Sequence, residues 1–220
     1  MKDTIQTLGD GNKIAFVLMA VILLSVSYPL ADMGDAAALI YLGVYVILVC
    51  STIYFVSGNR ILLVLNLLLT FAITLFAVMN IFNDPVPVWL GMAWNVSGLV
   101  QQLLVFALLV AFIIQSKAVN RKVLYAAVTI YFFMATCFAT LFNLIEIVSP
   151  GAFIASNNAE ITPTILTYFS LVTISTLGYG DIIPVAPAAQ SLAVLESSVG
   201  TLYIAILIGR FVGLYQQDPS

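Results

Sequence analysis

The chain has 220 residues, of which 62% are hydrophobic and 8% are charged. Soluble globular domains average about 45–50% apolar and about 25% charged residues, so this composition excludes a soluble enzyme. Seven Lys and Arg residues against ten Asp and Glu residues give a net charge of −3, which argues against a nucleic-acid-binding protein. The absence of histidine removes the commonest general base and the commonest transition-metal ligand. The composition therefore predicts a polytopic integral membrane protein that is not an enzyme.

Six apolar runs have the length, about 20 residues, that an α-helix needs to cross a bilayer. They are predicted at 14–30, 36–56, 61–82, within 89–114, and at 123–148 and 188–215. The first run follows a charged stretch, as the apolar core of a signal peptide does. That stretch contains Asp3 and Asp10 beside its lysines, and Ser-Val-Ser-Tyr-Pro is a poor cleavage site, so we expect a retained helix.

The basic residues predict the orientation of these spans. Six spans place the N-terminus, the 57–60 turn, the 115–122 loop and the C-terminus on one side, and that side holds every Lys and Arg of the chain. The charged residues in the loops of the opposite side are all acidic, among them Asp84 and Glu160. Because basic loops stay in the cytoplasm, we expect a multi-pass protein of the plasma membrane with both termini cytoplasmic.

A segment of different character separates the last two spans. Thr162 and Pro163 are typical of a helix start, as N-cap and first helical residue. The apolar run 165–174 that follows is too short to cross a bilayer, which favours a re-entrant helix. It leads into Thr-Leu-Gly-Tyr-Gly-Asp at 176–181, where two glycines permit left-handed backbone. Backbone that makes no helical hydrogen bonds can line a water-filled cavity. Its carbonyl oxygens can then replace the water shell of a monovalent cation.

The string at 176–181 resembles the filter signature of the prokaryotic pore-loop potassium channels, and the similarity extends over about 123–214. The resemblance implies that the backbone carbonyls of Thr176, Leu177, Gly178 and Tyr179, with the Thr176 hydroxyl, bind K⁺ as the permeant ion. Support for this filter is expected from Thr173, Ser175, Gly180, Asp181 and Glu196. Ser175 stands where many members have a second Thr; it is expected behind the filter, where it should alter support rather than selectivity. Leu177 stands where many have Val, and it keeps the backbone carbonyl. One filter segment cannot surround an ion, so the resemblance implies a homotetramer.

The sixth span contains two further positions of interest. Gly200 resembles the hinge glycine of the family, although a small residue for close helix packing is an alternative. Glu196 is the one carboxylate well inside a span, and it either supports the filter, acts as a pH-sensitive element, or makes an ordinary polar contact. Helical spacing predicts that one face lines the pore and contributes to gating, through Thr201, Ile204, Ile208 and Val212.

The sequence divides into a four-helix region, 1–122, and a pore domain, 123–220. A voltage sensor needs several basic residues in its fourth span, because each charge supplies only about 2.3 kcal/mol per 100 mV. No Lys or Arg occurs between Arg60 and Lys117. We therefore do not expect a conventional voltage sensor; the first four helices are expected to surround the pore, anchor the tetramer, or bind membrane lipid or an unidentified ligand.

The resulting prediction is an all-α integral membrane protein with six transmembrane helices, a re-entrant pore helix and a filter loop. Its predicted function is passive, potassium-selective conduction by a homotetramer, without a nucleic-acid partner. Two alternatives remain open from the sequence. One is a weakly selective cation channel gated by a ligand, and the other is a potassium or ligand sensor that does not conduct.

Overall fold

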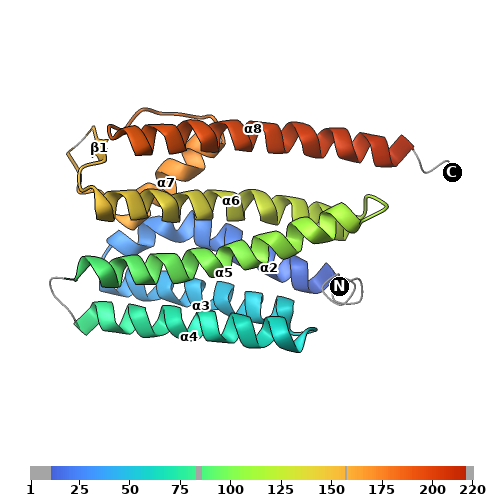
Figure 1. Ribbon diagram of the computed structural model, residues 1–220, viewed down its shortest axis with the longest axis horizontal. Coiled ribbons are helices and arrows are strands. Elements are labelled where there is room, and N and C mark those ends of the chain that lie inside the picture. Colours follow the sequence, from blue (N-terminus) through green and yellow to red (C-terminus); the bar gives the residue numbers. More distant parts are fainter. Residues whose placement is uncertain (1–10, 83–85, 157, 217–220) are drawn as a thin grey trace.

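The structure is a computed structural model that describes residues 11–82, 86–156 and 158–216 (Figure 1). In the N-terminal half, helix α2 (Gly11–Ser27) and the short 3₁₀ helix η1 (Tyr28–Asp32) precede α3 (Asp35–Val56), α4 (Arg60–Phe82) and α5 (Val88–Gln115). The remaining elements are α6 (Arg121–Val148), strand β1 (Phe153–Ala155), α7 (Pro163–Ile174), strand β2 (Ile182–Pro184) and α8 (Pro187–Gln216).

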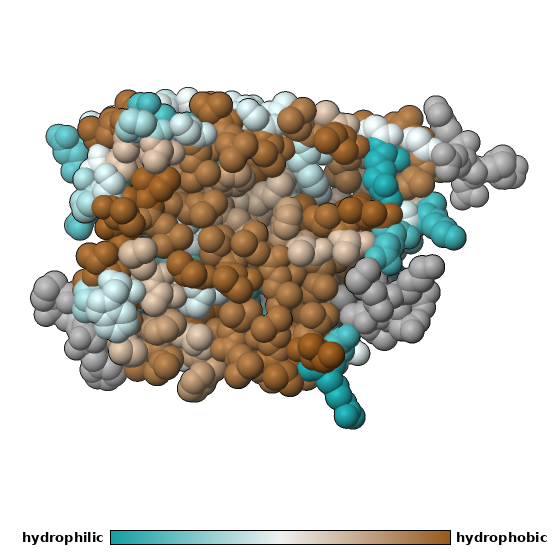
Figure 2. All heavy atoms as spheres, viewed as in Figure 1, coloured by the Kyte–Doolittle hydropathy of each residue, from teal (hydrophilic) through white to brown (hydrophobic). Residues whose placement is uncertain are grey.

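Six of the described helices are long and apolar enough to cross a membrane, and α7 with 12 residues is not. The predicted all-α membrane fold with six spans is therefore confirmed. Figure 2 shows the consequence on one face, where hydrophobic residues cover the middle and hydrophilic residues gather at the ends. Two short strands that the sequence prediction did not include, β1 and β2, pair in antiparallel fashion outside the helices.

Helix α2 ends earlier than the predicted first span, at Ser27 rather than at residue 30. Pro29 explains the difference, because proline lacks an amide hydrogen and disfavours α-helical backbone at the residue before it. The chain continues as the 3₁₀ turn Tyr28–Asp32, in which this proline occupies one of the first two positions.

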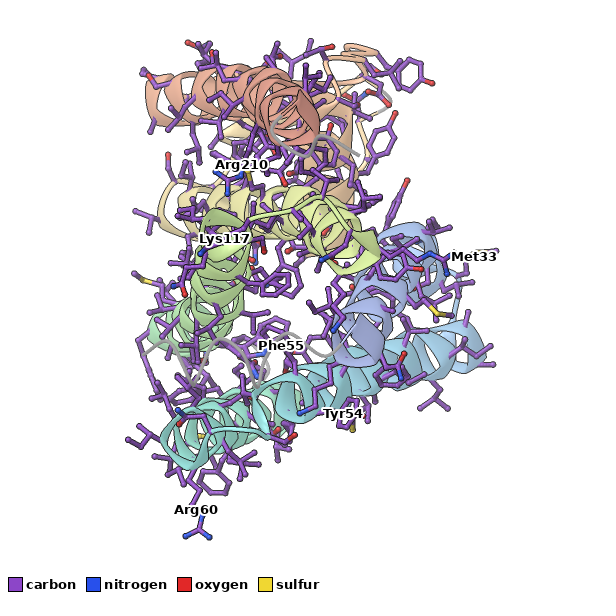
Figure 3. All side chains as sticks on the ribbon, turned by 90° about the vertical axis from the view of Figure 1, so that its right-hand side faces the viewer. Met33, Tyr54, Phe55, Arg60, Lys117 and Arg210 are labelled. Carbon is purple, nitrogen blue, oxygen red and sulfur yellow. The ribbon has the colours of Figure 1, made fainter. Side chains whose placement is uncertain are left out.

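The helices pack so that α6 lies at the centre of the molecule. It contacts α5 and α2 on one side and α7 and α8 on the other, while α3 and α4 complete the N-terminal bundle (Figure 1). The start of α2, the end of α8, the α3–α4 turn and the α5–α6 loop all lie at one end of the molecule. Figure 3, viewed from that end, shows Arg60, Lys117 and Arg210 on three separate segments.

Two hydrophobic cores stabilise this arrangement. The larger one joins α2, α3, α5 and α6 and reaches the end of α7 at Ile174. The smaller one surrounds β1 and α7, where the rings of Phe142, Phe153 and Phe169 pack edge-to-face with centroids 5.1–5.5 Å apart. This aromatic cluster fixes α7 against α6, which positions the loop that follows α7.

Candidate functional site

Helix α7 begins where the sequence predicted. The Thr162 side chain is the N-cap and its Oγ1 accepts a hydrogen bond from the amide of Ile165 at 3.3 Å. Pro163 follows as the first helical residue, a position that needs no amide donor. The helix ends at Ile174, and its C-terminal carbonyls, which carry the negative end of the helix dipole, precede the loop 175–181.

The loop after α7 has an alternating backbone. Thr176, Gly178 and Gly180 have positive φ values of 58°, 54° and 74°, whereas Leu177 and Tyr179 between them do not. Alternation of residues with positive φ and residues without it can turn successive carbonyl oxygens toward one side of a strand. Residues 175–180 are all exposed in the single chain, so this strip of backbone lies open at the protein surface.

Hydrogen bonds to α7 hold the first half of the loop, including Thr176 in its left-handed conformation. The Thr176 amide donates to Thr173 O and the Leu177 amide to Val172 O, both at 3.0 Å. The Ser175 hydroxyl donates to Leu171 O at 2.7 Å. Several of the last carbonyls of α7 therefore accept bonds from the loop itself, which fixes where the alternating strip begins.

The second half of the loop is fixed at Asp181. The Tyr168 hydroxyl of α7 donates to Asp181 Oδ2 at 2.7 Å, and the Ile182 amide donates to Oδ1 at 3.1 Å. The Asp181 carbonyl in turn accepts from the Ser156 amide at 2.8 Å, next to the β1–β2 pair. Both ends of the loop are thus tied to elements that the aromatic cluster holds in place.

Glu196 lies where three helices meet. Its side chain is fully buried, and Oε1 is hydrogen-bonded to the Ser170 hydroxyl of α7. Ser170 Oγ also donates to Ala135 O of α6 at 2.6 Å. This contact joins α6, α7 and α8 beneath the loop, so Glu196 is placed among the residues that support α7.

Gly200 lies where α8 approaches the end of α7. A Cβ atom at this position would be 2.6 Å from both Cγ1 and the carbonyl oxygen of Ile174. The Tyr131 hydroxyl of α6 donates to the same oxygen at 3.2 Å. A small residue is required at this crossing for packing alone, while the role of Gly200 as a hinge stays a prediction.

Comparison with known proteins adds to this geometry. The sequence model of the family described as "Ion channel" matches residues 102–217, just over half of the chain. The chain belongs to this ion channel family. Two-pore potassium channel 4 of Arabidopsis thaliana is 42% identical over 45 residues, which cover 20% of this chain and 16% of that protein. The channel therefore matches only a small part of this curated relative, and no solved structure matches it.

In the channel, the predicted pore-lining residues of α8 are exposed. Thr201, Ile204, Ile208 and Val212 follow one another at helical spacing along a stripe of the helix. The Thr201 hydroxyl is hydrogen-bonded to Ser197 O of its own helix. Their assignment to the inner cavity stays a prediction.

The contacts of Arg210 do not follow from the sequence, which predicts only that every Lys and Arg lies on the cytoplasmic side. The Arg210 guanidinium donates to the carbonyls of Ile113, Ile114 and Ser116 at 2.9, 3.0 and 3.2 Å. The end of α8 is therefore bound to the C-terminus of α5, whose carbonyls favour a cation. No local pattern could indicate this contact, because it joins residues nearly a hundred positions apart.

The polar residues of α5 bind neighbouring helices. Asn95 Oδ1 accepts from Asn143 Nδ2 of α6 at 2.8 Å, and Gln101 Nε2 donates to Thr70 Oγ1 of α4 at 3.0 Å. The channel thus has neutral side chains hydrogen-bonded between helices along α5.

Proposed function

We propose that this ion channel conducts potassium selectively, through a pore surrounded by four copies of the chain. The observation that carries the proposal is the alternating backbone of the Thr-Leu-Gly-Tyr-Gly-Asp segment, exposed at the end of α7. Carbonyl oxygens of Thr176, Leu177, Gly178 and Tyr179, with the Thr176 hydroxyl, would replace the water shell of K⁺. Ions in adjacent sites then repel one another and advance passively down their gradient.

The exposure of the loop supports four-fold assembly. One strip of carbonyls contacts an ion from one side only, and a closed cyclic oligomer supplies the other sides. Helix α8 supports the same conclusion, because large apolar side chains outside the predicted pore-lining stripe, such as Val194, Leu202 and Ile206, are exposed on it. We infer that the homotetramer covers the loop and part of this apolar surface.

Potassium is the proposed ion for two reasons. The segment 176–181 resembles the filter signature of potassium channels, and the relative from Arabidopsis thaliana is named a potassium channel. Leu177 replaces a more common Val without changing the backbone carbonyl that the ion contacts. Asp181 closes the segment, and its carboxylate would attract cations to the outer mouth of the pore.

The proposed location is the plasma membrane, with both chain ends in the cytoplasm. The end of the molecule that holds Arg60, Lys117 and Arg210 is basic, and basic loops stay on the cytoplasmic side (Figure 3). The loop 175–181 then faces the outer half of the bilayer. Conduction of this kind makes and breaks no covalent bond, so the protein would not be an enzyme.

Gating by charges in the fourth span is not part of the proposal. Between Arg60 and Lys117 the sequence has no basic residue, and the polar side chains of α5 are neutral and hydrogen-bonded to α4 and α6. We place the gate in the filter or on α8, where Gly200 lies opposite Ile174 and the apolar stripe ends at Val212.

Ion flux from liposomes tests the proposal, with K⁺ or Na⁺ as the only permeant cation. The wild-type chain is expected to release K⁺ and not Na⁺. Gly178→Ala places a side chain at a φ of 54° and is expected to abolish selective flux, because such backbone costs about 1–2 kcal/mol for an L-residue in each of four chains. Gly43→Ala on α3, where a Cβ meets nothing within 4 Å, is the matched control and should conduct normally. Equal K⁺ and Na⁺ flux would contradict potassium selectivity, and no flux in any condition would contradict conduction.

A further inference from the structure

A cavity of about 410 Å³ lies between the N-terminal helices and the pore domain. Its walls come from the halves of α2 to α6 that lie away from the basic end of the molecule, and from the first turns of α7. This volume is within the range of about 300–1,000 Å³ that is typical of small-molecule sites.

The cavity does not continue through the bundle. Towards the basic end, Phe55 and Val56 of α3 pack with Val105 and Leu109 of α5 in the larger hydrophobic core. Phe55 is fully buried and extends into the space between these helices (Figure 3). The cavity is therefore a pocket closed at one end and not a second route for ions.

The chemistry of the walls selects an uncharged ligand. None of the described residues that line the cavity carries a charge, so a charged molecule would lose its hydration without a counter-charge. The walls instead combine aromatic surface, from Tyr45 and Trp94, with the hydrogen-bonding side chains of Gln102 and Thr140. Such walls suit a molecule with an apolar body and a small polar group.

Ser25 indicates where that polar group binds. The side chain lines the cavity, is only 3% exposed, and its hydroxyl has no hydrogen-bond partner among the described residues. Buried hydroxyls almost always have a partner, so this one is an exception. Ser27, two residues further along α2, differs in this respect because its hydroxyl donates to Leu24 O at 3.3 Å.

We propose that this cavity is a binding site for a small uncharged amphiphile, whose hydroxyl or carbonyl group bonds to Ser25 Oγ while its apolar part lies against Tyr45 and Trp94. The same cavity reaches Pro163 and Thr167 of α7. A bound molecule therefore contacts both the N-terminal helices and the helix that carries the filter loop. Binding at this site does not depend on whether the chain conducts ions.

Benzyl alcohol is a suitable probe, and Trp94 on the cavity wall reports its binding. The chain has two tryptophans, so Trp89→Phe leaves Trp94 as the single emitter. The expected result is a saturable change of Trp94 emission with benzyl alcohol. Ser25→Ala should weaken the affinity about threefold to tenfold, the loss expected for one hydrogen bond, whereas Ser27→Ala should leave it unchanged. Toluene, which lacks the hydroxyl, should bind the wild type and Ser25→Ala alike.

A second variant covers the case in which Ser25→Ala perturbs folding. Gly98 lines the cavity and a Cβ there meets nothing within 4 Å, so Gly98→Leu should fill the space and abolish the saturable signal. A change that is linear in benzyl alcohol and equal in all variants would overturn the proposal and assign the cavity to water alone. Ion flux measured on the same samples separates the two proposals: flux without saturable binding overturns the site only, and binding without flux overturns the channel only.

Discussion

Substitution of Gly200 by alanine is expected to displace the end of α7 and thereby the filter loop. The added Cβ would lie 2.6 Å from the carbonyl oxygen of Ile174, and ordinary contact begins at 3.4 Å, so one of the two helices must move by about 0.8 Å. Rotation of the Ile174 side chain relieves the contact with Cγ1 but not the contact with the backbone oxygen. Overpacking of this kind costs about 1–3 kcal/mol.

Thermal unfolding of the purified protein measures this cost. A chain of this size loses about 2–4 °C for each kcal/mol, so the midpoint of Gly200→Ala should fall by about 2–12 °C. Its ratio of K⁺ to Na⁺ flux should fall as well, because Ile174 directly precedes the loop. Gly213→Ala is the matched control on α8, where a Cβ meets nothing within 4 Å. An unchanged midpoint together with an unchanged flux ratio in Gly200→Ala would refute the reasoning.

Three further predictions concern other contacts of α8 and of the loop that follows α7. Glu196→Gln retains groups that can bond to Ser170 and should change the free energy of unfolding by less than about 1 kcal/mol, whereas Glu196→Ala should lower it by about 2 kcal/mol or more. Equal stability of the two variants would argue against a supporting role. Arg210→Gln should lower the free energy of unfolding by about 2 kcal/mol through loss of its bonds to α5, and wild-type stability would contradict that contact. Asp181→Asn should reduce single-channel K⁺ current mainly at low ionic strength; a salt-independent reduction would contradict electrostatic attraction.

The spans and the start of α7 could be predicted because their determinants are local. A run of apolar residues fixes each transmembrane helix, and the pair Thr162 and Pro163 fixes where α7 begins. The positive φ values at Gly178 and Gly180 also follow from residue type, since glycine adopts them without strain. The positive φ of Thr176 does not follow from residue type, because it depends on the hydrogen bonds between α7 and the loop.

The contacts between distant segments could not be predicted. Arg210 binds the end of α5, and Tyr168 of α7 binds Asp181. Each depends on how helices pack, which periodicity and local motifs do not specify. The cavity beside Ser25 belongs to the same class, because six helices form its walls together.

The reversal potential of the purified channel in a planar bilayer, with K⁺ on one side and Na⁺ on the other, tests the central claim most directly. If four strips of carbonyls from residues 176–179 select K⁺, the current should reverse at a potential far from zero, with the sign set by K⁺ flow. Gly178→Ala should not show this potential. A wild-type reversal potential near zero would contradict the account, because K⁺ and Na⁺ would then pass equally well.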